Sequence, residues 1–213
     1  MSIVFAHELV YPRDQCYNVY LDSDHIRALP TDSPSMVDLW VNYILSIHRR
    51  RLDGRGRLIV SLDVEWRPPF LSGARNPIAT LQLCVGGDCL IFQIIHAASV
   101  PGSLFTFLAN SEFTFMGVGI RRDAEMLLED YGLQVANVVD LAVLAEEKLG
   151  IRALRNAGLK RLASEVLGRY IEKPLSITTS RWDNRELTPA QVQYATMDAF
   201  LSYEIGRTLN AMG

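Results

Sequence analysis

The nine residues LIVSLDVEW at positions 58–66 decide the fold, because they form the most strand-like apolar run of the chain and carry two acids within it. Strand side chains alternate between two faces, so Asp63 and Glu65 share one face, about 7 Å apart, and Leu62 and Val64 share the other. Two ionised carboxylates on a buried face repel each other, and the run has no Lys or Arg to compensate them. A divalent metal ion is the natural counter-charge. The alternative is a strand at a solvated edge, where both acids face water.

Two more apolar runs follow, at residues 78–85 and 89–95, joined by Gly86-Gly87-Asp88. A short connection with glycines is typical of a tight hairpin, so we expect three neighbouring strands in an antiparallel meander. Beyond Pro101 we expect strands at 114–118 and 137–139 and helices at 103–108, 121–131, 141–149, 158–167 and 189–209. Several strands in a row, followed by strands that alternate with helices, predict an α/β domain in which helices pack on the faces of a mixed sheet.

The N-terminal part predicts extended segments at 3–11 and 17–21, separated by the turn-forming Pro12-Arg13-Asp14. A helix is expected after Asp32-Ser33-Pro34, since a capping residue and a proline begin many helices. The expected apolar face of this helix consists of Met36, Leu39, Trp40, Tyr43, Ile44 and Ile47.

Length and composition suit one domain. With 213 residues and 49% apolar content the chain can fill a continuous core, so we expect a single domain over 1–213, with strands and a helix at 1–57 and the main core at 58–213. No apolar stretch reaches roughly 18 residues and the N-terminus lacks a signal-peptide pattern, so we expect an intracellular protein, in the cytoplasm or nucleus, with no membrane span. The net charge of −3 argues against a nucleic-acid binder that relies on a broadly basic surface, although bound cations would offset part of it.

The three cysteines, Cys16, Cys84 and Cys89, have neither the spacing of metal ligands nor that of a disulfide framework. Such a set suits a reducing compartment. We therefore expect buried, small apolar side chains and no disulfide.

Two further acids fall on predicted helices. Asp123 follows the strand exit Gly117-Val118-Gly119-Ile120, whose glycines let the backbone turn into a helix. The alternative for Asp123 is an ordinary acid that interacts with the helix dipole. Tyr194 and Asp198 are four residues apart on a helix that begins with the capping box Thr188-Pro189-Ala190-Gln191, so they share one face. Their alternative is a pair at the helix surface.

Four carboxylates on these elements would suit two hard divalent ions, Mg²⁺ or Mn²⁺, because such ions prefer oxygen ligands; they are Asp63, Glu65, Asp123 and Asp198. Zinc fits less well, since the four histidines are scattered without ligand spacing. A two-ion site suits phosphodiester hydrolysis, in which one ion lowers the pKa of the attacking water and the other stabilises the departing 3′ oxygen.

Three segments resemble the motifs of the DEDDy 3′-5′ exonucleases, a family of RNase H-like (DnaQ-like) fold, and in particular the Werner syndrome-type exonuclease domain. They are Leu62-Asp63-Val64-Glu65-Trp66, Val118-Gly119-Ile120-Arg121-Arg122-Asp123 and Tyr194-Ala195-Thr196-Met197-Asp198. The likeness runs from about residue 58 to the C-terminus and includes ATLQLC at 79–84, Gly158-Leu159-Lys160 and Trp182-Asp183-Asn184. The three motifs in this order are specific, unlike any one of them alone.

The resemblance implies a metal-dependent 3′-5′ exonuclease with two Mg²⁺ or Mn²⁺ ions. Asp63, Glu65 and Asp198 would hold the ion next to the nucleophile, and Asp63 and Asp123 the second ion, partly through water. Tyr194 would orient the attacking water through its hydroxyl. A phenol with an ordinary pKa near 10 is a better positioning group than a base at neutral pH.

Two neighbouring positions concern the substrate. Trp66 would border the substrate groove, with a place in the core as its alternative. Glu125 stands where Werner-type domains have an aromatic residue, so the stacking contact of those domains has no counterpart at this position.

The chain also resembles small stand-alone plant proteins of this group, among them the RISC-interacting clearing exoribonucleases. This likeness implies action on single-stranded nucleic acid, with RNA favoured over DNA, and a homo-oligomer that forms a ring-shaped hexamer. Two other hypotheses stay open: a catalytically weak nucleic-acid-binding or assembly module of the same fold, and an endonuclease.

Overall fold

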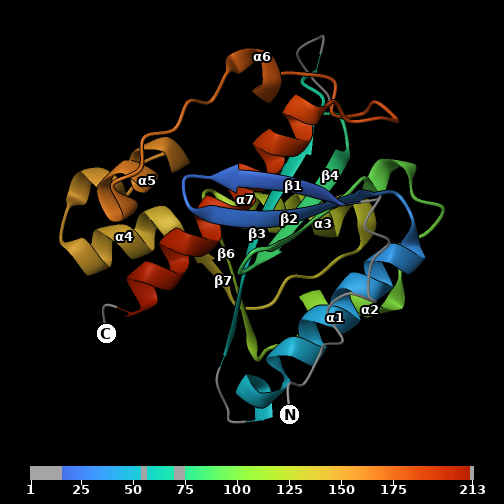
Figure 1. Ribbon diagram of the computed structural model, residues 1–213, viewed down its shortest axis with the longest axis horizontal. Coiled ribbons are helices and arrows are strands. Elements are labelled where there is room, and N and C mark those ends of the chain that lie inside the picture. The colour runs from blue at the N-terminus through green and yellow to red at the C-terminus, as the bar shows by residue number, and fades with distance from the viewer. Residues whose placement is uncertain (1–15, 54–56, 70–74, 212–213) are drawn as a thin grey trace.

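The structure is a computed structural model that describes residues 16–53, 57–69 and 75–211. The extended segment expected at 3–11 lies outside these residues. Seven strands form one sheet with helices around it, which confirms the α/β prediction (Figure 1). The strands are β1 Tyr17–Leu21, β2 Asp24–Thr31, β3 Leu58–Trp66, β4 Ile78–Val85, β5 Asp88–Phe92, β6 Phe113–Gly117 and β7 Val138–Asp140. The helices are α1 Pro34–Asp53, α2 Gly102–Leu108, α3 Ile120–Tyr131, α4 Leu141–Leu149, α5 Leu159–Leu167, α6 Leu175–Thr178 and α7 Pro189–Ala211, with 3₁₀ turns at Ile94–His96 and Arg152–Leu154.

The sheet has the strand order β1-β2-β5-β4-β3-β6-β7. The strands β3, β4 and β5 pair antiparallel as the expected meander. On the other side of β3, β6 and β7 add parallel strands. The hairpin β1-β2 joins the same sheet through parallel pairing of β2 with β5. The first half of β3, up to Ser61, is paired with β6, whereas the half that carries Asp63 and Glu65 is paired with β4 alone among the described residues. Both acids are nevertheless half-buried, so they do not simply face water as the solvated-edge alternative requires.

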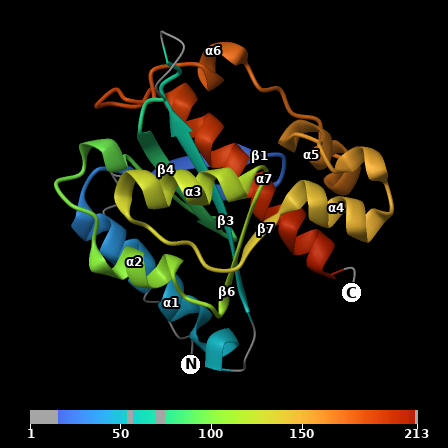
Figure 2. The same cartoon turned by 180° about the vertical axis from the view of Figure 1, so that it is seen from behind.

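Helices cover both faces of the sheet. The long helix α7 crosses one face and contacts β1 through β6, and α4 and α5 pack beside it. The helices α1, α2 and α3 cover the opposite face, as the two views from front and back show (Figures 1 and 2). The sheet therefore separates two apolar layers, and any side chain of β3 belongs to one of them.

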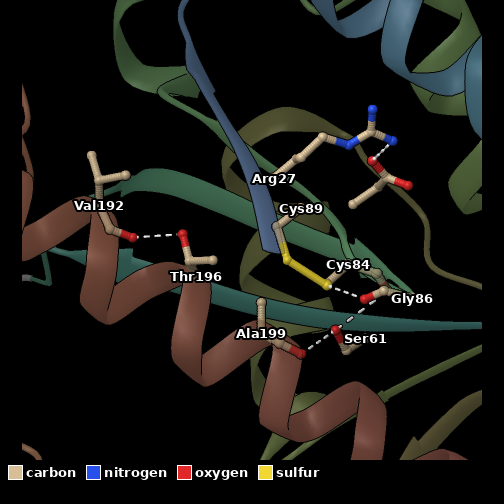
Figure 3. Close-up of a disulfide and its surroundings, with 9 residues drawn as sticks. Arg27, Ser61, Cys84, Gly86, Cys89, Val192, Thr196 and Ala199 are labelled. Atoms are coloured by element: carbon tan, nitrogen blue, oxygen red, sulfur yellow. Dashed lines mark hydrogen bonds and ion pairs between the residues drawn. A yellow bond between two sulfur atoms is a disulfide. The ribbon is translucent and has the colours of Figure 1, made fainter. Parts of the chain in front are cut away.

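Strand alternation in β3 assigns its side chains to these two layers. The layer with α1, α2 and α3 receives Leu58, Val60, Leu62 and Val64. Ser61 is out of phase with them and donates a hydrogen bond to the carbonyl oxygen of Ala199 in α7, at 2.6 Å (Figure 3). Asp63 and Glu65 share the phase of Ser61, so they lie on the α7 side of the sheet.

The capping box at the start of α7 is present as expected. The backbone N–H of Thr188 donates to Gln191 Oε1 at 2.9 Å, and the backbone N–H of Gln191 donates to Thr188 Oγ1 at 3.2 Å. This reciprocal pair fixes where the helix begins and hence which residues face the sheet. The side chains of Ala195 and Ala199 are almost fully buried there, and their small size lets α7 lie close to the strands.

The expectation of no disulfide is wrong. Cys84 and Cys89 form a disulfide between β4 and β5, beside α7 (Figure 3). The two-residue turn places Val85 opposite Asp88, and Cys84 is therefore directly opposite Cys89 in the ladder, with a Cα–Cα distance of 4.2 Å. Directly opposed residues of antiparallel strands bring their side chains close together. Both side chains are buried, as expected.

The expected face of α1 is wrong at two positions. Leu39 and Ile47 are exposed, whereas Val37 and Val41 are buried with Trp40. The buried positions recur at helical spacing around Trp40, so the face that packs on the sheet is rotated relative to the expected one.

Three secondary-structure elements differ from those expected: one strand is shorter, and one strand and one helix were not expected. The third strand of the meander ends at Phe92 rather than at 95, because a 3₁₀ turn follows. The strand β2 and the short helix α6 were not expected as elements.

Within the described part of the chain, no helix is both long enough and apolar enough to cross a membrane.

Replacement of Gly117 at the end of β6 tests the close approach of β6 to β3. An added Cβ would collide with the carbonyl oxygen of Leu62 in β3, which is backbone and has no room to move. We expect Gly117→Ala to lower the free energy of unfolding by about 2–3 kcal/mol, measured by urea denaturation. Gly102→Ala is the matched control, because a Cβ there meets open space, and it should change stability by less than about 0.5 kcal/mol. Equal stability of the two variants would contradict the clash.

Candidate active site

Acids from β3 and α7 converge on the covered face of the sheet. Asp63, Glu65 and Asp198 each place a carboxylate oxygen within 4.8 Å of the other two. The strand supplies its pair through alternation, and α7 supplies Asp198 from the position next to Ala199, which is bonded to β3. Asp198 is buried, and the two strand acids are half-buried. The acids that the sequence placed on separate elements are neighbours in space.

Asp123 lies beside this group, in the first turn of α3. Its side chain is buried, and its charge acts on Glu65 while that of Asp63 acts on it. The N-cap residue of α3 is Gly119, in a left-handed conformation (φ 73°), so the chain turns sharply from β6 into the helix. This turn brings Asp123 toward the ends of the sheet strands.

A fifth carboxylate, Asp140, lies close to Asp123 but is engaged elsewhere. Its Oδ2 accepts the backbone N–H of Gly119 at 2.9 Å, and its Oδ1 accepts that of Ala142 at 2.8 Å as the cap of α4. Its charge raises the pKa of Asp123. Asp140 therefore supports the loop that positions Asp123.

Burial raises the pKa of all four predicted acids, and repulsion by a neighbouring acid raises it further for Asp63, Glu65 and Asp123. Burial is the largest cause for each. The next cause is the charge of Asp198 for Asp63, and the charge of Asp63 for both Glu65 and Asp123. The raised pKa values mean that too little positive charge surrounds the ionised carboxylates in this structure to balance them.

One cation stands among the acids. Lys173, from the segment between α5 and α6, forms an ion pair through Nζ with Asp198 Oδ2. Its charge lowers the pKa of Asp63, Glu65 and Asp198, although burial outweighs it at each of them. The same ammonium lies 5.0 Å from the ring centroid of Tyr194.

Tyr194 lies one helical turn before Asp198, as predicted, and is held on several sides. Its hydroxyl accepts a hydrogen bond from Thr178 Oγ1 at 3.1 Å, and its ring packs against Trp182, with ring centroids 5.9 Å apart. Burial, and then the charge of Asp198, raises the pKa of Tyr194 to about 12. The hydroxyl therefore keeps its proton at neutral pH, which suits a group that orients water rather than a base.

The positions expected near the substrate have different surroundings. Trp66 is half-buried and packs against the core layer of α1, α2 and α3, which agrees with the core alternative for this residue. Glu125 is exposed on α3, two residues beyond Asp123.

The donor set fits hard divalent cations. All ligand atoms that converge are carboxylate oxygens, and their unbalanced negative charge calls for a cation of higher charge than one ammonium. Among the described residues, no histidine or cysteine belongs to the group, so it lacks the nitrogen and sulfur ligands of a structural zinc site.

Sequence reasoning missed Lys173 and Thr178, which reach the site from the segment between α5 and α7. This segment crosses above the start of α7 (Figure 1). It is fixed there by Trp182, whose Nε1 donates to the carbonyl of Thr178 at 3.2 Å, and by Gln191 of α7, whose Nε2 donates to Ser180 Oγ at 3.0 Å. The segment has no periodic pattern, so only its quoted likeness at Trp182 pointed to it.

Comparison with known proteins identifies related sequences. The sequence model of a family described as 3′-5′ exonuclease matches residues 48–213. A 3′-5′ exonuclease of Arabidopsis thaliana is 31% identical over 185 residues, which cover 86% of this chain and 63% of that protein. The bifunctional 3′-5′ exonuclease/ATP-dependent helicase WRN of Mus musculus is 35% identical over 156 residues, 73% of this chain and 11% of that protein. Human exonuclease 3′-5′ domain-containing protein 2 is 34% identical over 149 residues, which cover 68% of this chain and 24% of that protein. The chain thus spans less than two thirds of the length of each of these relatives.

Solved structures share the fold. Brucella melitensis NrnC matches with a TM-score of 0.60 and 22% identity, over 76% of each chain. A structure described as the apo form of the nuclease matches with a TM-score of 0.61 and 23% identity, over 75% of this chain and 74% of that one. The RNase H-like fold expected from the sequence is confirmed.

The raised pKa of Asp63 predicts a pH dependence of stability in metal-free protein. Folded Asp63 binds its proton more tightly than the unfolded chain does, because burial and Asp198 raise its pKa from 3.8 to about 7. Stability is therefore lost as the pH rises from about 4 to about 7. We expect Asp63→Asn to gain more than about 1.4 kcal/mol relative to the parent protein across this range, because asparagine has no proton to lose.

Urea denaturation in EDTA between pH 5 and pH 8.5 measures this difference. Glu147→Gln, at an exposed position of α4, is the control and should give a curve parallel to that of the parent protein. A curve for Asp63→Asn that is also parallel would contradict the raised pKa.

Proposed function

We infer the function of this chain from its family, because the chain belongs to the 3′-5′ exonuclease family. It would remove nucleotides from the 3′ end of single-stranded nucleic acid, in a reaction that depends on divalent ions. The observation that carries the proposal is the convergence of Asp63, Glu65 and Asp198 with Tyr194 one helical turn away. An acid cluster that converges in this way fits metal-assisted hydrolysis better than covalent catalysis.

The acids would hold two ions, Mg²⁺ or Mn²⁺. Asp63, Glu65 and Asp198 would bind the ion beside the attacking water, and Asp63 with Asp123 the second ion. When bound, such ions lower the pKa of water and stabilise the negative charge that develops on the phosphate and the leaving oxygen. The placement of Asp123 outside the close group of three supports its assignment to the second ion.

The role of Tyr194 is to position the attacking water. Its hydroxyl keeps its proton, because its pKa is raised, and it accepts a hydrogen bond from Thr178. Without metal the hydroxyl also hydrogen-bonds with Asp198 and Lys173, so its proton would turn to another acceptor once Asp198 binds metal. A water oxygen in line with the scissile phosphate would be such an acceptor. The ring contact with Trp182 limits how far the hydroxyl can swing.

The finer substrate assignment is single-stranded RNA ahead of DNA. It rests on the likeness to small plant exoribonucleases. The exposed part of Trp66, at the end of β3 next to Glu65, is the proposed border of the substrate groove.

We also propose self-association, as a hexamer, from the same likeness. The edge strand β1 supports it, because two exposed tyrosines, Tyr17 and Tyr20, lie on it. Exposed aromatic residues on a sheet edge favour pairing with another chain. A sedimentation experiment that finds only monomer would contradict this assembly.

The nuclease activity is tested with a 5′-labelled oligonucleotide and Mn²⁺ or Mg²⁺. We expect a ladder of products shortened from the 3′ end and no products in EDTA. Asp63→Asn should lower the rate by more than about 100-fold, because loss of a metal ligand costs more than loss of a supporting residue. Glu147→Gln removes an exposed acid from α4 and should keep the parent rate.

Matched RNA and DNA oligomers, single-stranded and duplex, test the finer assignment in the same assay. We expect the single-stranded RNA to be shortened fastest. Binding without turnover would favour the catalytically weak module instead, and cleavage of a circular strand would favour an endonuclease.

A further inference from the structure

Lys173 is in an unusual place for a lysine, because it pairs with a member of the acid group that is expected to bind metal. Its ammonium contacts Asp198 Oδ2 and hydrogen-bonds with Tyr194, and its charge reaches Asp63 and Glu65. Its side chain is 30% exposed, whereas that of Asp198 is 4% exposed. The ammonium thus enters the acid group from the solvent side on a long, flexible stem.

The other described cation that acts on the predicted acids has a different position. Arg122 is exposed on α3, and its charge acts on Asp123. Lys173, by comparison, acts on the three converging acids and on the tyrosine. Of these two cations, Lys173 alone is an internal counter-charge for the group formed by β3 and α7.

We propose that Lys173 is a positioning residue that holds Asp198 and Tyr194 in the metal-free protein and yields Asp198 to the divalent ion when metal binds. This inference rests on the metal binding assigned under the proposed function. While no metal ion is bound, the ammonium of Lys173 supplies the positive charge, so that the three carboxylates stay together instead of repelling one another.

The ammonium of Lys173 and a divalent ion would compete for the Asp198 carboxylate, because both are positively charged and would lie close together. A dication held by Asp198, Glu65 and Asp63 would lie close to the ammonium that contacts the same Asp198 carboxylate, and two positive charges at such a distance repel each other strongly in a partly buried site. The ammonium can leave, because its stem is flexible and partly exposed. The acids cannot leave, because Asp63 and Glu65 are on a strand held in the sheet and Asp198 is on a helix bonded to that strand. Metal entry therefore displaces the lysine.

Isothermal titration of Mn²⁺ into metal-free protein without substrate tests this displacement. We expect Lys173→Met to bind Mn²⁺ about tenfold more tightly than the parent protein, because the competing charge is gone. Arg122→Met is the matched control: it removes one positive charge that acts on the neighbouring Asp123, and it leaves the ion pair of Asp198 in place. It should change the affinity by less than about threefold.

The thermal stability of the same proteins gives a second readout at pH 8. In EDTA, Lys173→Met should have a lower Tm than the parent protein, because the acids lose their counter-charge. Saturating Mn²⁺ should raise the Tm of Lys173→Met by more than it raises that of the parent. Lys173→Arg keeps the charge and should behave like the parent in EDTA, which guards against a general folding defect at this position.

Either of two results would overturn the inference: equal Mn²⁺ affinity of Lys173→Met and parent, or equal Tm of the two in EDTA. These outcomes are separate from failure of the proposed function. If the parent protein binds no Mn²⁺, metal binding itself is wrong and the inference falls with it. If the parent binds Mn²⁺ and Lys173→Met binds it no more tightly, the proposed function stands and the displacement is wrong.

Discussion

The repulsion between Asp63 and Glu65, held on one face of a strand beneath α7, is the constraint on which the rest of the structure depends. Removing ionised carboxylates from water costs several kcal/mol for each group unless a cation compensates them. Here β3 is fixed by its ladder to β4, by its ladder to β6 up to Ser61, and by the apolar layer on its other face, so Asp63 and Glu65 stay together on the α7 side of the sheet. Asp198 adds a third negative charge to the same place.

Much of this arrangement was predictable because it follows from local rules. Alternation along residues 58–66 sets the acids of β3 on one face, and the side chain of Ser61 confirms that phase by reaching α7. The capping box fixes the start of α7 and therefore places Tyr194 and Asp198 on one face, where both are buried. In each case a single residue pattern within one element was sufficient, and the structure had only to bring the elements together.

The features that escaped prediction depend on contacts between segments far apart in the chain. The pairing of β2 with β5 joins residues separated by some sixty positions, and nothing in either segment alone indicates it. The disulfide depends on which residues face each other across a hairpin, a matter of register that the presence of a turn does not decide. Lys173 reaches Asp198 from an irregular segment, so no spacing in the sequence connects the two.

These long-range contacts explain why α7 serves both stability and the site. Its small residues let it lie close to the sheet, its carbonyl at Ala199 accepts the bond from β3, and the next residue toward its N-terminus is Asp198. A shift of the helix by one position would break the bond from Ser61 and also move Asp198 away from the strand acids. The segment that bears Lys173 and Thr178 is held to the start of the same helix through Gln191. Asp198 and Tyr194 are therefore placed by α7 itself. The strand acids are tied to α7 through Ser61, and the backbone of the segment with Lys173 is tied to it through Gln191, which keeps an electrostatically costly group together.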